Sequence, residues 1–219
     1  MLPWQRFARA SRACLQVLSD LIVPEYCAAC DAPIETDHVF CVRCGSCPDA
    51  PPGSVFASVG GSYAPPLSTA IRRFKFSHRA DLARPLARLL PWPFDDDVRA
   101  AAQRTVVPVP LHYARLVERG FNPPGLLGHE LARRVGAAFS PELLRRQRAT
   151  AQQSRLPARE RRANVAGAFS APSSARGRQV VLVDDVLTTG ATLEACCQAL
   201  YAAGVGHVTV LALAAAPAP

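Results

Sequence analysis

The stretch VVLVDDVLTTGAT, residues 180–192, decides the fold. It opens with four apolar residues, 180–183, that show no polar alternation, as in a central strand of a parallel sheet covered on both faces. Asp184 and Asp185 follow at the expected end of this strand. In open α/β sheets ligands bind at the carboxyl ends of the strands, so the acidic pair stands at a ligand-binding position.

A loop follows Leu187 and leads into a helical pattern that stops at Gly204. Backbone N–H groups at the start of a helix are unpaired and converge on one point, where the helix dipole also favours an anion. A glycine in the loop lets the backbone approach a phosphate, and threonine hydroxyls add donors. The carboxylates upstream only accept hydrogen bonds, so they suit sugar hydroxyls, held directly or through a hard cation such as Mg²⁺. The stretch predicts capture of a phosphorylated sugar by the acidic pair and by Thr188, Thr189, Gly190, Ala191 and Thr192.

Composition excludes other phosphate loops, because this one lacks the Gly-Lys of a Walker A motif and the three spaced glycines of a dinucleotide fingerprint. The stretch instead resembles the phosphoribosyl-pyrophosphate (PRPP) motif of type I phosphoribosyltransferases, in which an acidic pair holds the ribose hydroxyls and a TTGAT-type loop holds the 5′-phosphate. The resemblance implies an α/β fold with a central, mostly parallel sheet flanked by helices. It also implies PRPP with Mg²⁺ as ligand, and Asp184 and Asp185 as the first candidates for catalytic residues. The alternative is a buried strand and a capped helix start with an incidental acidic pair.

The rest of the pattern fits one such domain over residues 54–219. A chain of 219 residues with 49% hydrophobic composition can hold one sizeable core and a small second unit. Apolar runs and periodicity predict strands Val55–Tyr63, Thr105–Pro110 and Val208–Leu213, and helices Leu67–Phe76, Leu82–Leu90 and one from the N-cap Asn122 through Ala138. Between the first two helices, Arg72, Arg73, Lys75, His78 and Arg79 make a basic edge, and Lys75 is the only lysine of the chain.

A cysteine cluster precedes this domain, with members at Cys27, Cys30, Cys41, Cys44 and Cys47. Two CxxC pairs separated by ten residues can place four thiolates around one Zn²⁺ in a segment too small to hold its own core. The spacing predicts one structural zinc in a module over residues 24–50. Cys47 also forms a CxxC pair with Cys44, which leaves open the spare thiol among Cys41, Cys44 and Cys47, and His38 is a weaker candidate ligand. The disulfide alternative requires an oxidising compartment.

Residues 1–23 combine arginines with an apolar run. Ser19 and Asp20 interrupt that run, which is too short to span a bilayer and is followed by no small-residue cleavage site. We therefore expect an amphipathic helix, no transmembrane segment and a cytoplasmic protein. Docking of this helix on a membrane surface is the alternative.

Positive charge is concentrated between His112 and Arg162, which contain eleven arginines and four glutamates in a chain of net charge +8. Such a block attracts phosphate-rich partners, although an ordinary arginine-rich surface has the same composition. The segment 145–164 is polar and arginine-rich, which is typical of a mobile loop that closes over an anionic ligand. The candidates for pyrophosphate or lid contacts are His112, Arg115, Arg119, Arg148 and Arg161.

Taken together, the motifs resemble the ComF family over nearly the whole chain. The resemblance rests on the cysteine pairs, on PVPLHxxRLxxRGFN at residues 108–122, on the PRPP motif, and on Thr150, Gln153, Leu156, Arg161, Asn164 and Phe169 at their spacings. Two features depart from the family pattern. Pro123 stands where a glutamine usually follows RGFN, and the cysteine-rich part is shorter than in members with two zinc-ribbon units, which implies one zinc.

The resemblance implies a link to natural competence and to the handling of single-stranded DNA, and it leaves two hypotheses. The first is an enzyme that transfers ribose 5-phosphate from PRPP to a nucleophile. The second is a non-catalytic module of the DNA uptake machinery that retains the fold and binds single-stranded DNA or partner proteins. The implied partners are PRPP, single-stranded DNA and competence proteins, and the sequence is compatible with an oligomer.

Overall fold

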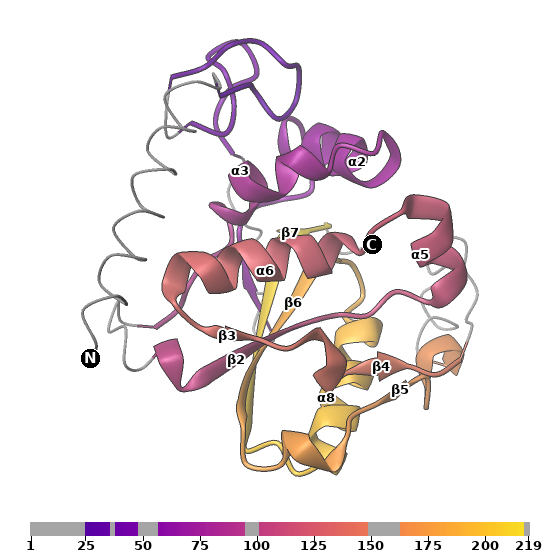
Figure 1. The fold of residues 1–219 in the computed structure, drawn as a ribbon. Helices are drawn as coiled ribbons and strands as arrows, with labels where there is room; N and C mark the ends of the chain where they lie inside the picture. The colour runs from indigo at the N-terminus through magenta and orange to yellow at the C-terminus, as the bar shows by residue number, and fades with distance from the viewer. Residues whose placement is uncertain (1–24, 36–37, 48–56, 95–100, 149–162, 217–219) are drawn as a thin grey trace, which may run out of the picture.

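A computed structural model describes residues 25–35, 38–47, 57–94, 101–148 and 163–216 (Figure 1). The helix expected over residues 1–23, as well as Arg161, lies outside these residues. The described chain forms a five-stranded sheet with a hydrophobic core on each face, and a cysteine-rich segment joins one of these cores. Among the helices of the described ranges, none has the length and apolar character needed to cross a membrane.

Parallel strands form the central sheet, in the order β1-β7-β6-β2-β3. Their bounds are Ser58–Val59 for β1, Arg104–Pro108 for β2, Ala138–Phe139 for β3, Gln179–Leu187 for β6 and His207–Ala215 for β7. The chain turns in opposite directions after β2 and β6, because β2 leads to β3 on one side and β6 leads to β7 on the other. A topological switch point therefore lies between the carboxyl ends of β2 and β6, where α/β proteins bind ligands.

Helices cover both faces of the sheet (Figure 1). Their bounds are Leu67–Phe76 for α2, Ala83–Ala87 for α3, Tyr113–Arg119 for α5, Pro123–Val135 for α6 and Ala191–Ala202 for α8. On one face α2, α3 and α6 share a core with Val106, Val181 and Val183, and on the other α8 shares a core with Val107 and Leu182. Because successive side chains enter opposite cores, both faces of these strands must be apolar.

A short antiparallel ribbon lies beside the sheet and pairs β4 (Arg145–Arg146) with β5 (Phe169–Ser170). It brings together the two ends of the segment 149–162, which lies outside the described residues. Single 3₁₀ turns, at Ala80–Leu82, Pro141–Leu143 and Ser173–Ala175, complete the described elements.

The structure confirms the first helix at Leu67–Phe76 and lengthens the central strand. We expected that strand to end before Asp184, but β6 continues to Leu187 because β7 runs alongside it to Ala215 and supplies backbone partners. The acidic pair therefore lies within the last part of the strand. Alternation then places Asp184 on the α8 side of the sheet and Asp185 on the α2 side.

Three expected elements are shorter in the structure. Within the described residues 57–63 of the strand expected over Val55–Tyr63, regular strand structure is limited to Ser58–Val59, and the following residues reach β7 through a bridge at Ser62 and separate backbone hydrogen bonds. The helix expected over Leu82–Leu90 is divided into a 3₁₀ turn and α3, and Arg134 of α6 donates hydrogen bonds to carbonyl groups at the end of α3. Helix α6 ends at Val135 instead of Ala138, because Gly136 takes a left-handed conformation with φ 74° and stops it.

Candidate functional site

The site at the switch point is built around the acidic pair of β6. Asp185 is buried, with 7% of its surface exposed, and its Oδ1 accepts a hydrogen bond from Lys75 Nζ at 2.7 Å. The side chains of this ion pair are 18% (Lys75) and 10% (Asp185) exposed, so the contact is largely withdrawn from water. Lys75 belongs to α2, and the two residues are 110 positions apart in the sequence. From the sequence, Lys75 was assigned only to a basic edge and not to the site. The one feature that distinguished it there is that it is the single lysine of the chain.

Asp184 is partly buried and faces a different set of groups. Its Oδ1 accepts a hydrogen bond from the backbone N–H of Asp185 at 2.8 Å. Burial, and then the negative charge of Asp185, raise the pKa of Asp184 to about 7, while the charges of Lys75 and Arg146 act in the opposite direction. Burial and the neighbouring carboxylate therefore both favour the neutral form of Asp184.

The loop after β6 leads directly into α8. Gly190 has φ 78° and is the N-cap of the helix, a left-handed conformation that glycine adopts without strain. Ala191 begins α8 and is buried, and the N–H of Glu194 donates to the carbonyl group of Gly190 at 2.8 Å. Thr188 is exposed, and Thr189 and Thr192 are partly buried. The acidic pair and the start of α8 are thus joined by one short loop, as a sugar-phosphate site requires.

Two arginines interact electrostatically with the acidic pair. Arg119, at the end of α5, is half-buried, and its guanidinium carbon lies 5.0 Å from the centroid of the Phe76 ring. Burial lowers the pKa of Arg119 and the charge of Asp185 raises it. Arg146 of β4 lies over Phe169 at 5.4 Å, burial lowers its pKa, and the charge of Asp184 is among the groups that raise it. Sequence analysis identified Arg119 as a candidate for pyrophosphate contacts. It did not identify Arg146, which it included only in the arginine-rich segment.

The other basic candidates make contacts of their own. The Nδ1 atom of His112 accepts the N–H of Ala114 at 3.3 Å and so caps α5. Arg115 pairs with Glu118 of the same helix at 2.7 Å. Arg148 donates to the carbonyl groups of residues 164 and 166 at 3.2 and 2.9 Å, which ties together the two sides of the ribbon.

Asn122 stands at the N-cap of α6, but its side chain makes no capping hydrogen bond. The first two residues of α6, Pro123 and Pro124, have no N–H to cap, so the amide is free for another contact. Its Nδ2 donates to the carbonyl oxygen of Val109 at 3.1 Å, and its Oδ1 is buried with no hydrogen-bond partner among the described residues. Asn122 therefore fixes the end of β2 at the switch point.

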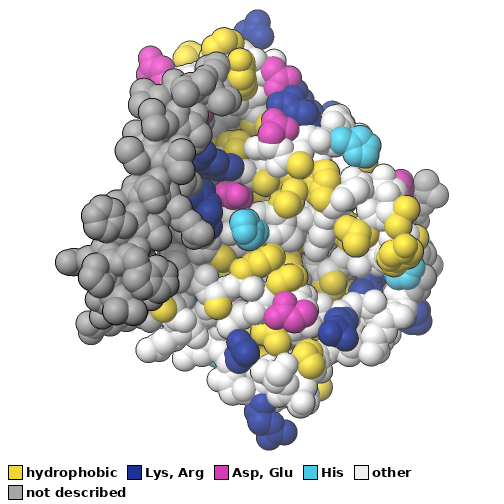
Figure 2. Space-filling view, in the orientation of Figure 1, with side chains coloured by type: hydrophobic (Ala, Val, Ile, Leu, Met, Phe, Trp, Pro, Cys, Tyr) yellow, Lys and Arg dark blue, Asp and Glu magenta, His cyan; other side chains and the backbone are white. Residues whose placement is uncertain are grey.

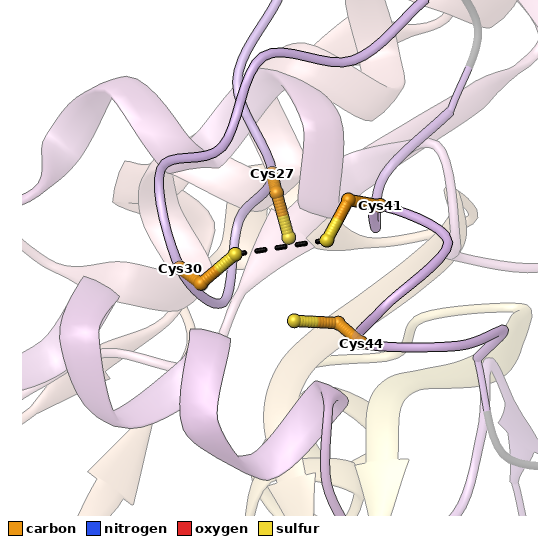
Figure 3. Close-up of side chains that lie close together, drawn as sticks. All are labelled: Cys27, Cys30, Cys41 and Cys44. Carbon is orange, nitrogen blue, oxygen red and sulfur yellow. Dashed lines mark hydrogen bonds between the residues drawn. The ribbon is translucent and has the colours of Figure 1, made fainter.

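A second site is formed by four cysteines of the N-terminal segment. The Sγ atoms of Cys27, Cys30, Cys41 and Cys44 all lie within 4.8 Å of one another (Figure 3). A tetrahedral zinc with bonds of about 2.3 Å requires sulfur–sulfur distances of about 3.8 Å. The Sγ atoms of Cys30 and Cys41 are 3.7 Å apart, which fits this geometry and is too long for a disulfide bond. Four close thiols can therefore hold one zinc ion.

Each CxxC pair forms a tight turn of the same type. The N–H of Asp31 donates to the carbonyl group of Cys27, and the N–H of Gly45 donates to that of Cys41, at 2.9 and 3.0 Å. The thiols interact with one another: the backbone N–H of Ala32, followed by the neighbouring thiols, lowers the pKa of Cys30 to about 6, while hydrogen bonds to Cys30 and Cys41 raise the pKa of Cys44 to about 12. The Sγ of Cys47 lies 3.8 Å from the carbonyl oxygen of Gly60, outside the group of four.

The cysteine segment is packed onto the main domain. Cys27, Ala28, Val39 and Phe40 are buried in the same core as α2 and α3. Ion pairs reinforce this contact. Arg88 makes two hydrogen bonds to Glu25, at 2.7 and 3.0 Å, and Asp31 pairs with Arg73 and Arg79, the latter at 2.8 Å. The segment is therefore an integral part of one packed unit.

Comparison with known proteins gives the same type of domain. The family described as phosphoribosyl transferase domain matches residues 126–219. DNA utilization protein YhgH of Escherichia coli (strain K12) is 38% identical over 194 residues, which cover 85% of this chain and 82% of that protein. Competence protein F of Haemophilus influenzae is 34% identical over 197 residues, with coverage of 87% and 85%. The chain belongs to the ComF family. This ComF family member combines a type I phosphoribosyltransferase-like fold with an N-terminal cluster of four cysteines, and the names of the two relatives refer to DNA utilization and competence.

Among solved structures, the allosteric regulatory enzyme of purine biosynthesis aligns with 63% of the ComF family chain and with 25% of its own chain. The sequence identity is 23% and the TM-score is 0.38. The fold of the ComF family chain follows from the domain match and from its parallel sheet.

Proposed function

We propose that this ComF family protein binds PRPP together with Mg²⁺ and acts in competence-related DNA uptake or metabolism in the cytoplasm. The observation that carries the proposal is the position of Asp184 and Asp185 at the switch point, in the last part of β6 and close to the loop that begins α8. A strand end, an acidic pair and a helix start are thus joined in the order that a ribose 5-phosphate requires.

The acidic pair has the chemistry needed for ribose and a divalent cation. Carboxylate oxygens accept hydrogen bonds from hydroxyl groups and are the ligands that Mg²⁺ prefers. Asp185 already holds a cationic group at 2.7 Å, so the position accommodates positive charge. Asp184 and Asp185 would hold the ribose hydroxyls and the cation, which would neutralise charge on the pyrophosphate.

The phosphate groups would contact two further parts of the site. The loop Thr188–Thr192 would hold the 5′-phosphate through backbone N–H groups, threonine hydroxyls and the helix dipole. Arg119 and Arg146, which interact electrostatically with the acidic pair, are the first candidates for pyrophosphate contacts. His112, Arg115, Arg148 and Arg161 would complete the anion-binding region.

Such a site suits transfer of the ribose 5-phosphate group to a nucleophile. The transition state carries oxocarbenium-like charge and the leaving group is an anion, so stabilisation is mainly electrostatic and needs few reactive side chains. Asp184 and Asp185 are the candidates for catalytic residues of this reaction.

We further propose that Cys27, Cys30, Cys41 and Cys44 hold one structural Zn²⁺, since four thiolates leave no open position for water.

A non-catalytic module that binds single-stranded DNA is the second candidate function, and one surface favours it. Tyr113 and Phe76 are 76% and 64% exposed, and Arg119 lies over Phe76. Figure 2 shows hydrophobic side chains exposed on the side of the molecule where Figure 1 places α5. Exposed aromatic rings beside arginines suit stacking of unpaired bases next to a charged backbone.

Calorimetry with PRPP tests the first proposal. Binding is expected with Mg²⁺ present, and it should be lost with a chelator of Mg²⁺ and in the variant Asp184→Asn/Asp185→Asn. Binding of equal strength in the wild type and the double variant would disprove the proposed site. Tight binding of ATP without any binding of PRPP would also exclude it.

A further inference from the structure

One member of the acidic pair already forms an ion pair with a cationic side chain of the protein. Lys75 Nζ lies 2.7 Å from Asp185 Oδ1, and both side chains are largely withdrawn from water. Lys75 comes from the last turn of α2, which packs on the face of the sheet opposite to α8. A ligand cation that approaches Asp185 therefore meets an occupied oxygen atom.

The type of side chain matters here, because the chain has 25 basic residues and only this one is a lysine. An arginine grips a carboxylate through two parallel hydrogen bonds of its planar guanidinium group, as Arg88 does with Glu25. A lysine ammonium is instead a compact point charge on a flexible stem, with donors that rotate freely. It resembles a small metal ion in charge distribution, and it can leave a carboxylate without breaking a two-point contact.

We propose that Lys75 is an exchangeable counter-ion: it holds Asp185 in the unliganded protein and is displaced when Mg²⁺ and the sugar hydroxyls of the ligand take over that carboxylate. The proposal rests on the proposed PRPP site and adds to it a residue outside the PRPP motif. Two neighbouring carboxylates, largely shielded from water, repel each other unless a cation stays close. Lys75 supplies this charge before ligand binding, so the site is preformed without metal.

After displacement, the ammonium group of Lys75 would stay close to the part of the site where an anionic group of the ligand can bind. Arg119 and Phe76 lie at the same end of α2, and Arg119 also interacts electrostatically with Asp185. An anionic group of the ligand that enters beside Arg119 gives Lys75 a new partner at the moment Asp185 is released. The exchange then keeps every charge paired, which favours ligand and cation binding together over the binding of either alone.

The decisive experiment uses Mn²⁺ alone, without PRPP, as a probe of the acidic pair. Wild-type protein is expected to bind Mn²⁺ weakly, because Lys75 competes for Asp185. Lys75→Gln should bind Mn²⁺ at least about tenfold more tightly, since it removes a positive charge from the site. The gain should vanish in Lys75→Gln/Asp185→Asn. Arg72→Gln is the matched control, because it removes the same charge from an exposed position of α2 and should leave Mn²⁺ binding unchanged.

A second variant separates exchange from a purely structural ion pair. Lys75→Arg keeps the charge and the pairing with Asp185, so the melting temperature of the unliganded protein should be retained. The stronger two-point grip should weaken binding of PRPP with Mg²⁺ by about tenfold. Equal PRPP affinity in Lys75→Arg and the wild type, or equal Mn²⁺ affinity in Lys75→Gln and the wild type, would overturn the proposal. If wild-type protein binds no PRPP at all, the proposed function fails while the Mn²⁺ comparison still decides the role of Lys75.

Discussion

Arg73 Nη1 donates a hydrogen bond to the carbonyl oxygen of Ala28 at 3.2 Å, and this contact joins α2 to the first CxxC turn. Two positions further along the same helix, Lys75 contacts Asp185. Residues two apart on an α-helix point to nearly opposite sides. Helix α2 therefore stands between the cysteine cluster and the acidic pair, with one basic residue directed to each.

The first prediction concerns the ligands of the metal. Because Cys27, Cys30, Cys41 and Cys44 converge while Cys47 lies near Gly60, Cys41→Ser should lower the zinc content well below one ion per chain. Cys47→Ser is the matched control and should retain one zinc. Elemental analysis of protein purified without added zinc measures both. Loss of zinc in Cys47→Ser, with retention in Cys41→Ser, would show that Cys44 and Cys47 form the second metal-binding pair.

The second prediction concerns how the protein unfolds without metal. Since Cys27, Val39 and Phe40 share one core with α2 and α3, removal of zinc should destabilise the whole described unit. A strong chelator should lower the melting temperature by roughly 10 °C, because a structural zinc contributes several kcal/mol to folding. Calorimetry should show a single transition. A separate low-temperature transition followed by an unchanged main one would mean that the cysteine segment folds independently.

The longer strands and helices could be predicted from the sequence for local reasons, whereas α5 and the two-residue strands β3, β4 and β5 were not predicted. The helix Leu67–Phe76 has a clear apolar stripe, and residues 180–183 are apolar on both faces, so periodicity and composition suffice. The end of β6 could not be predicted, because Asp184 and Asp185 interrupt the apolar run and only the neighbouring β7 extends the strand. The spare cysteine was also undecided, since both CxxC spacings are equal and packing against Gly60 makes the difference.

The third prediction follows from the raised pKa of Asp184. Its pKa is about 7 in the folded protein against an ordinary value of 3.8, so the folded chain binds more protons than the unfolded chain between these values. Stability of the unliganded protein should therefore fall as pH rises from about 4 to 7, by about 2 kcal/mol between pH 5 and 7 from this group. Asp184→Asn should remove this component and be the more stable protein at pH 8. Denaturant unfolding at several pH values measures it, and parallel profiles for both proteins would contradict the assignment.

The fourth prediction distinguishes the two members of the acidic pair. Asp185→Asn leaves the Lys75 ammonium largely buried without its carboxylate, and should reduce the free energy of unfolding by about 2 to 4 kcal/mol. Asp184→Asn leaves the Lys75–Asp185 ion pair in place, so it should not reduce the free energy of unfolding in this way. The strand motif alone gives no sign of this loss, because the contact is with a residue 110 positions away in the sequence. Lys75→Gln/Asp185→Asn should recover part of the loss, and an Asp185→Asn protein as stable as Asp184→Asn would refute this reasoning.

The candidate site was predictable only where its residues are consecutive. The acidic pair and the Thr188–Thr192 loop form one motif, so sequence analysis assigned them to one site. Lys75 and Arg146 reach the pair from α2 and β4, and these contacts depend on the sheet order and on the ribbon. Long-range electrostatics of this kind leave no spacing pattern in a single sequence.

The last prediction separates a lid from a nucleic-acid surface in the arginine-rich segment 145–162. The ribbon pairs the start of this segment, Arg145–Arg146, with Phe169–Ser170, and Arg146 interacts electrostatically with Asp184, so the segment begins beside the acidic pair. If it closes over pyrophosphate, PRPP with Mg²⁺ should protect it from trypsin, which cuts after arginine. Single-stranded DNA should bind weakly, with a log–log salt slope of about 0.7 per phosphate contact, and should compete partially with PRPP. The reason is that the segment carries more positive charge than one pyrophosphate neutralises. Cleavage unchanged by PRPP, or DNA binding independent of salt, would show that the segment contacts neither ligand in this way.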